Sequence, residues 1–131
     1  MSFFKINNLD IEYQTRKETI KASKKVCFNL ERGEIIGIVG ESGSGKSTVA
    51  NGIINLIDKP GKVTGGSIKL DGVELCNNER VIQTIRGKKI GFIFQDTQTS
   101  LNPLFKIKEQ LVETIQTHSS LNYKEAEKKS I

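Results

Sequence analysis

The chain has 131 residues, the length of one ordinary domain, and its 36% hydrophobic and 27% charged residues exclude a disordered tail. Its formal net charge of +5 permits attraction to a nucleotide, a nucleic acid or an anionic membrane, but the basic residues are scattered, so we expect no nucleic-acid partner. No apolar stretch approaches the roughly 20 residues of a membrane-spanning helix, and the first residues lack the pattern of a secretory signal. We therefore expect a cytoplasmic protein.

The first third of the chain predicts three strands. Residues 9–13 alternate apolar and charged side chains, which is the period of a half-buried strand. A second strand is expected over residues 26–30, with residues 14–25 as a polar loop or an extended hairpin connection. Residues 35–39 are an uninterrupted apolar run, typical of a strand covered on both faces in a parallel sheet, and we expect the central strand there.

Helices and a hairpin are predicted in the rest of the chain. Apolar residues recur at helical spacing from Val49 to Ile57, and Pro60 with Gly61 is expected to end that helix. Residues 67–75 predict a β-hairpin, because the Asp-Gly pair at its centre favours a tight turn. The later elements expected are a weak helix over residues 78–86, a buried strand at 90–94, a helix beginning near residue 107 and the opening of another over 123–131.

The loop at residues 40–47 reads GESGSGKS and satisfies the phosphate-binding pattern G-x-x-x-x-G-K-[ST] in full. Its glycines let the backbone turn successive amides toward phosphate oxygens, and the helix that follows adds its positive end. We expect Lys46 to reach the β- and γ-phosphates and the Ser47 hydroxyl to hold Mg²⁺. The structural alternative is an ordinary glycine-rich turn. The predicted nucleotide-binding residues of the loop are Gly40, Glu41, Ser42, Gly43, Ser44, Gly45, Lys46, Ser47 and Thr48.

These motifs resemble those of ATP-binding cassette (ABC) transporter ATPases. The resemblance lies in residues 37–48 and in the hairpin at residues 66–72. More narrowly, residues 85–96 and 99–103 resemble the subfamily that powers uptake of dipeptides, oligopeptides or nickel. One departure is Thr97, where that subfamily usually has proline.

The resemblance implies an α/β fold, namely a P-loop NTPase (RecA-like) core with an antiparallel β-subdomain, truncated early in the helical subdomain. It divides the chain into residues 1–96, the ATP-binding core with the β-subdomain, and residues 97–131, the continuation of the glutamine loop and the start of the helical subdomain. It also implies a nucleotide-binding subunit of a peptide or nickel importer. The implied partners are transmembrane permease subunits and a second ATPase subunit, at the inner face of the cell membrane.

Two residues outside the phosphate loop receive roles from the resemblance. Gln95 would offer its amide oxygen to Mg²⁺ and to the attacking water, which suits a side chain that coordinates without adding charge; alternatively it caps a strand end. Tyr13 is the candidate for stacking on adenine, and it equally suits packing on a strand face. His118 is expected to be a surface residue at a helix end rather than the switch histidine of the family.

The resemblance leaves the hydrolytic activity open. The family's aspartate–glutamate strand, serine–glycine–glycine signature and switch histidine are not among these 131 residues, so we expect a truncated chain that binds ATP better than it cleaves it. Two other interpretations are a nucleotide-binding module without catalytic duty and a small-molecule kinase in which Asp96 binds Mg²⁺.

Overall fold

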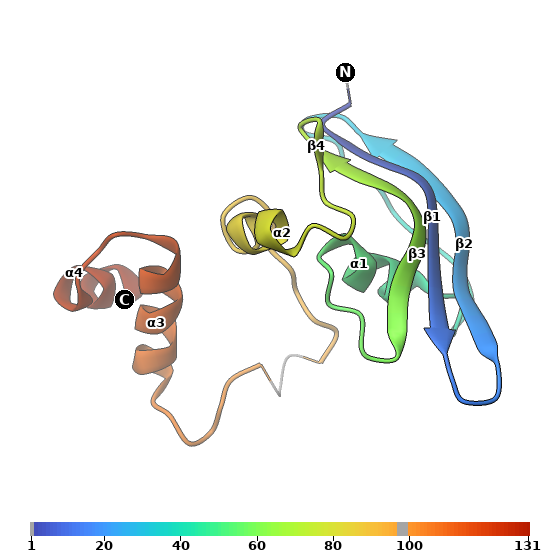
Figure 1. Ribbon diagram of the computed structural model, residues 1–131. Coiled ribbons are helices and arrows are strands. Elements are labelled where there is room, and N and C mark those ends of the chain that lie inside the picture. Colours follow the sequence, from blue (N-terminus) through green and yellow to red (C-terminus); the bar gives the residue numbers. More distant parts are fainter. Residues whose placement is uncertain (1, 97–99) are drawn as a thin grey trace. The chain divides into compact units, whose positions relative to one another are not determined.

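The computed structural model describes residues 2–96 and 100–131, so the departure at Thr97 lies outside the described residues. The chain forms two compact units, Met1–Thr84 and Ile85–Ile131 (Figure 1). The functional division into residues 1–96 and 97–131 stays a prediction. Within the described ranges, no helix combines the length and the apolar character that a membrane-spanning segment requires.

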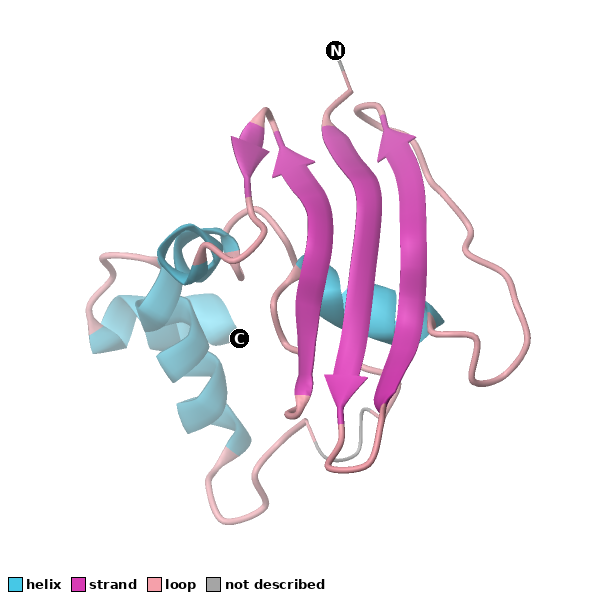
Figure 2. Ribbon diagram, turned by 45° about the vertical axis from the view of Figure 1, so that its right-hand side comes forward, coloured by secondary structure: helices cyan, strands magenta, loops and turns pink. Residues whose placement is uncertain are grey.

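The first unit is built on a four-stranded antiparallel sheet with the order β2-β1-β3-β4 (Figure 2). The strands are β1 (Phe4–Gln14), β2 (Thr19–Leu30), β3 (Gly61–Leu70) and β4 (Val73–Glu74). The predicted strands at residues 9–13 and 26–30 and the predicted hairpin at residues 67–75 are confirmed. Of the two alternatives for residues 14–25, the extended hairpin connection is confirmed and the polar loop is wrong, because β2 begins at Thr19 and pairs with β1. A short turn joins the two strands, with the Thr15 N–H donating to the Glu18 carbonyl at 2.9 Å.

Helix α1 (Lys46–Ile53) lies against one face of this sheet (Figure 2). The contact is close, since a Cβ added at Gly52 would come within 2.7 Å of the Ile11 Cδ1 atom. The helix ends earlier than the predicted Ile57, because Asn55 takes the left-handed backbone conformation with φ of 52°. Burial of each large apolar side chain here contributes about 1.5–3 kcal/mol. The core consists of Phe4, Ile6, Leu9, Ile11, Val49, Ile54, Ile68, Leu70, Leu75 and Ile82.

The buried strands predicted at residues 35–39, in a parallel sheet, and at residues 90–94 are not formed. Ile35 and Val39 are each 95% exposed in the first unit, and Ile93 is 90% exposed in the second. A parallel strand exists only through hydrogen bonds to neighbouring strands. The described residues offer no such ladder, only a single parallel bridge between Arg86 and Ile90. The apolar pattern therefore identifies segments that are suited to burial, but it does not show whether neighbouring strands are present to cover them.

Helix α2 (Glu79–Ile85) confirms the helix predicted near residues 78–86. In the second unit, α3 (Ile107–His118) and α4 (Tyr123–Ser130) confirm the two helices predicted there. His118 is the last residue of α3, and its imidazole is half-buried against Gly87. A Cβ added at Gly87 would lie 2.2 Å from the Nε2 atom of His118. The expectation of a residue at a helix end is thus met, with a less exposed ring than expected.

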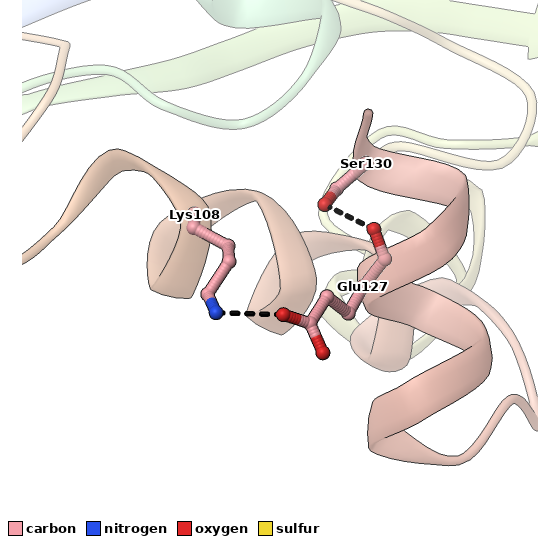
Figure 3. Close-up of polar contacts among 3 residues, drawn as sticks. All are labelled: Lys108, Glu127 and Ser130. Atoms are coloured by element: carbon pink, nitrogen blue, oxygen red, sulfur yellow. Dashed lines mark hydrogen bonds and ion pairs between the residues drawn. The ribbon is translucent and has the colours of Figure 1, made fainter.

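Helices α3 and α4 pack through Val112 and Ala126, which are 1% and 0% exposed. At the surface of this pair, the Lys108 ammonium donates to the Glu127 carboxylate at 2.6 Å, while the Ser130 hydroxyl donates to the Glu127 carbonyl at 2.7 Å (Figure 3). The hydrogen bond and the charge of Glu127 raise the pKa of Lys108 above its ordinary value of 10.5. Apolar burial, rather than this exposed ion pair, holds the two helices together.

Hydrogen bonds to the Glu74 carboxylate stabilise the β3–β4 hairpin in the first unit. The carboxylate accepts hydrogen bonds from the Ile68 N–H at 2.9 Å, from the Cys76 N–H at 3.1 Å and from the Ser67 hydroxyl. Partial burial is the largest single influence and acts to raise the pKa of Glu74, but these hydrogen bonds and the charge of Lys69 together lower it below 4.5. The folded hairpin therefore favours the ionised carboxylate.

A lowered pKa predicts acid sensitivity of the first unit. The stability that Glu74 contributes is present above its unfolded-state pKa of 4.5 and is lost as the pH falls through the lower folded-state pKa. We expect Glu74→Gln to remove this part of the pH dependence. Urea unfolding at about pH 7 and about pH 3.5 measures it, and the wild-type chain should lose more free energy of unfolding between the two than the variant. Equal losses would contradict the assignment.

Candidate functional site

The glycine-rich loop leads directly into α1, and Gly45 is the residue that caps the helix. Gly45 has φ of 88° and provides no side chain to cap the helix, whose first turn contains no acidic residue. The first amides of an α-helix have no partners within the helix and carry its positive end. The amides of Lys46, Ser47 and Thr48 are thus available to an anion.

A close contact with β2 holds Gly45 in place. A Cβ at Gly45 would lie 2.3 Å from the carbonyl oxygen of Ala22, so only glycine permits this approach. Ala22 occupies an irregularity of the sheet, since the pairing of β1 with β2 passes from Ile11–Ser23 to Glu12–Lys21 and leaves it unpaired. The extra residue in β2 therefore provides the surface against which the loop turns.

Lys46 is folded back onto its own loop. Its ammonium donates to the Gly40 carbonyl at 2.8 Å, to the Glu41 carbonyl at 2.6 Å and to the Ser44 hydroxyl at 3.2 Å. An ammonium has three donors, so all of them are used within the loop. Gly40 is also tightly placed, because an added Cβ would lie 2.8 Å from the Ser44 Oγ atom. If a phosphate oxygen accepted one of these hydrogen bonds in place of a loop oxygen, the ammonium of Lys46 would stay at the centre of the loop.

A pocket of about 590 Å³ lies beside this loop, within the size range of small-molecule sites. It brings together Tyr13 and much of the predicted phosphate loop. Its lining residues are Tyr13, Ile20, Lys21, Ala22, Gly43, Ser44, Gly45, Lys46, Ser47 and Thr48. Gly40 borders a neighbouring hollow of about 460 Å³ that also includes Ser44, Gly45 and Lys46. Glu41 and Ser42 are exposed and line neither of these two hollows.

Tyr13 stands at the end of β1, on the same face as the buried Leu9 and Ile11. It pairs with Ile20 of β2 and with Gly61 of β3. Its ring lies on Gly61, where an added Cβ would come within 2.6 Å of the Tyr13 Cε1 atom. Tyr13 therefore packs on the sheet and also lines the pocket, so the two roles considered for it are compatible. Its stacking on adenine stays a prediction.

Gln95 and Asp96 belong to the second unit, where both are exposed. Gln95 lies at a bend after residues 90–94, which form no strand, so it does not cap a strand end in this structure. Its predicted contact with Mg²⁺ stays a prediction.

The wall of the pocket formed by β2 was missed from the sequence. Ile20, Lys21 and Ala22 line the pocket because β2 runs back along β1 as far as Thr19. A signal was available, since the charged stretch at residues 15–18 can form a tight turn and would pair Tyr13 with Ile20. The polar composition of residues 14–25 conceals this pairing, since it suits a loop as well as an extended hairpin connection.

The chain belongs to the ABC transporter family, whose model matches residues 23–131. It is 39% identical to the oligopeptide transport ATP-binding protein OppD of Bacillus subtilis (strain 168) over 128 residues, which are 96% of this chain and 36% of that protein. It is 33% identical to the dipeptide transport ATP-binding protein DppD of Escherichia coli (strain K12) over 123 residues, which are 93% of this chain and 38% of that protein. The chain thus spans less than half the length of these relatives.

Solved structures show the same likeness. The dimeric post-hydrolysis state of the ATP-binding cassette MJ0796 bound to ADP and Pi matches with a TM-score of 0.80 and 32% identity, over 97% of this chain and 53% of that one. A second dimeric structure of MJ0796, described as a bacterial ABC transporter cassette, matches with a TM-score of 0.79 and 33% identity, over 95% of this chain and 53% of that one. The predicted cassette fold and the resemblance to peptide importers are confirmed.

The contact between Gly45 and Ala22 predicts unequal costs for alanine within one loop. Gly45→Ala combines left-handed strain with a clash against the Ala22 carbonyl, whereas Gly43→Ala meets only the strain, because its φ is 80° and nothing lies within 4 Å of its added Cβ. We expect Gly43→Ala to cost about 1–2 kcal/mol and Gly45→Ala clearly more. Urea unfolding of both variants measures the difference. Equal costs would show that the close approach to β2 is unimportant.

Proposed function

We propose that this chain binds ATP in the pocket beside the phosphate loop. One observation carries the proposal: the structure places an aromatic ring, Tyr13, in the same pocket as the uncapped amino end of α1 and Lys46. The pocket thus combines a flat apolar surface for a base with a positive end for phosphates. We propose residues 40–48 for the phosphates and Tyr13 for the base.

The phosphates would be held by backbone amides and one ammonium. Gly43 and Gly45 supply the left-handed backbone that lets successive N–H groups converge on an anion. Lys46 would exchange at least one of its bonds to Gly40, Glu41 or Ser44 for a phosphate oxygen. This exchange replaces a neutral acceptor by a charged one, which makes a stronger hydrogen bond.

Mg²⁺ would be held by Ser47 together with oxygens of the nucleotide. Ser47 lies in the first turn of α1, is exposed and lines the pocket. Among the described residues there is no group of three acidic, histidine or cysteine side chains that could hold a metal ion by itself. Mg²⁺ often keeps water and substrate phosphates as most of its ligands, so a single hydroxyl fits this role. Gln95 is the second side chain that we propose for the ion.

For the whole protein, we infer an ATP-binding subunit of a peptide importer. The support is the similarity to OppD and DppD and to a cassette solved with ADP and Pi. Such a subunit would work with transmembrane permease subunits and a second ATPase subunit at the cytoplasmic face of the membrane. In this setting Lys46 and Gln95 would position the γ-phosphate and the attacking water, which is the main part that a protein plays in phosphoryl transfer.

The Lys46 ammonium is the only side-chain cation that we propose for contact with the phosphates. Removing the ammonium with Lys46→Ala takes away a charged partner of the phosphates, so we expect about tenfold or greater loss of affinity for Mg²⁺–ATP. Isothermal titration calorimetry measures it. Lys17→Ala, in the exposed loop between β1 and β2, changes the net charge equally and should bind as the wild-type chain does. Unchanged affinity in Lys46→Ala would contradict the role of this lysine.

Binding of the base can be measured separately from binding of the phosphates. Tyr13→Ala should weaken ATP binding by about 1–3 kcal/mol, as loss of a stacked aromatic ring does. The same variant should bind inorganic tripolyphosphate as the wild-type chain does, and Tyr13→Phe should bind both normally because it keeps the ring. A competition assay with both ligands provides the comparison. Equal losses for ATP and tripolyphosphate would show that Tyr13 acts through the fold and not by stacking.

A further inference from the structure

A second hollow lies at the other end of β1 from Tyr13. It has a volume of about 860 Å³, and four segments of the first unit border it: the amino-terminal residues with the start of β1, the two residues after β2, the end of β3 and the β3–β4 turn. Lys5, on its border, is eight residues from Tyr13, or about 26 Å along an extended strand. The hollow is therefore separate from the phosphate loop.

Two lysines stand side by side at this hollow. Lys5 of β1 and Lys69 of β3 are direct partners across the sheet, an arrangement that destabilises a sheet through repulsion of like charges. Elsewhere in the same sheet the arrangement is the reverse, since Glu12 pairs with Lys21 on one side and Lys62 on the other. In the described part of the chain, no ion pair joins Lys5 or Lys69 to a carboxylate.

Nearby acids offset one lysine of this pair more than the other. Glu74 is the partner of Lys69 in β4, and the two charges attract one another, although the carboxylate makes its hydrogen bonds to Ser67 and to two backbone amides rather than to the lysine. Asp71 is engaged by Arg32, and Glu31 is the other carboxylate on the border. The residues that line the hollow thus include three cations and two carboxylates, and one of these carboxylates is paired with Arg32, while Glu74 lies beside Lys69 outside the lining.

Arg32 is the third cation on the border of the hollow. Its guanidinium donates to the Asp71 carboxylate at 2.7 Å and lies 4.3 Å from the centre of the Phe3 ring. Asp71 is itself held by a 2.8 Å hydrogen bond from its N–H to the Phe3 carbonyl. A guanidinium has five N–H donors, and the bond to Asp71 uses one of them. Arg32 is thus oriented in advance and retains donors for a further acceptor.

We propose that this hollow binds a phosphate-bearing anion through Lys5, Lys69 and Arg32. The two lysines provide point charges, the guanidinium adds directional donors, and Phe3 provides an apolar surface beside them. The volume is that of a small-molecule site. The same phosphate chemistry is found in a soluble phosphorylated metabolite and in the headgroup of an anionic phospholipid. A bound anion reduces the repulsion between Lys5 and Lys69, which destabilises the sheet when no anion is bound.

A titration of the ¹⁵N-labelled full chain with inorganic phosphate at low salt tests the proposal by NMR. The amides of Lys5, Arg32 and Lys69 report on this hollow, while those of residues 43–48 report on the phosphate loop, so failure at one site is distinguishable from failure at the other. We expect saturable shifts of the first group. Lys5→Gln and Lys69→Gln should each weaken this binding about fivefold and leave the shifts in the phosphate loop unchanged.

Lys62→Gln is the matched control, because Lys62 lies on β3 as Lys69 does but pairs with the acidic residue Glu12. It should leave phosphate binding at the hollow unchanged. If Lys62→Gln weakened phosphate binding as much as Lys5→Gln, the net charge of the chain would explain the loss, and the proposal would be overturned. Without any anion, Lys5→Gln should raise the melting temperature at low salt by removing the repulsion, and a lower melting temperature would contradict the premise.

Sedimentation with vesicles distinguishes the two sources of phosphate. Binding to phosphatidylglycerol vesicles but not to phosphatidylcholine vesicles, with loss in Lys5→Gln, would assign the hollow to lipid headgroups. Saturable shifts with free phosphate but no vesicle binding would assign it to soluble anions. Absence of both saturable shifts and phosphatidylglycerol binding would overturn the proposal.

Discussion

The close approach of Gly45 to the Ala22 carbonyl is the contact on which the site depends. It joins the first turn of α1 to β2, and it exists because Gly45 has no Cβ and Ala22 stands at an irregularity of the sheet. The contact sets where the amino end of the helix lies relative to β1 and β2. The positive end of α1 and the ring of Tyr13 consequently border one pocket.

Helix α1 and strand β1 each serve the fold and the site at once. The helix packs on Ile11 through Gly52 and presents its first amides to the pocket at its other end. Strand β1 buries Leu9 and Ile11 and ends at Tyr13. The apolar core thus positions the groups that bind ligand. The hydrogen bonds of Lys46 within the loop keep the cation near the loop while no phosphate is bound.

The sequence predicts best what depends on neighbours along the chain. The alternation at residues 9–13, the Asp-Gly turn, the later helices and the glycine pattern of the phosphate loop are local signals, and the elements that they predict are present. The left-handed Asn55, which ends α1 early, and the true start of β2 depend on packing and pairing that the local pattern does not reveal. Residues 35–39 and 90–94 fail as strands for the same reason, because strand pairing requires a distant partner.

In the proposed complex with ATP, the amides from Gly43 to Thr48 would hold the phosphates while the ring of Tyr13 would lie against the base. An NMR titration of the ¹⁵N-labelled chain with Mg²⁺–ATP tests it most directly. We expect the largest saturable amide shifts on residues 43–48, together with shifts of the Tyr13 ring protons. Saturable binding with its largest shifts elsewhere, or no shift in the loop of the folded chain, would contradict it.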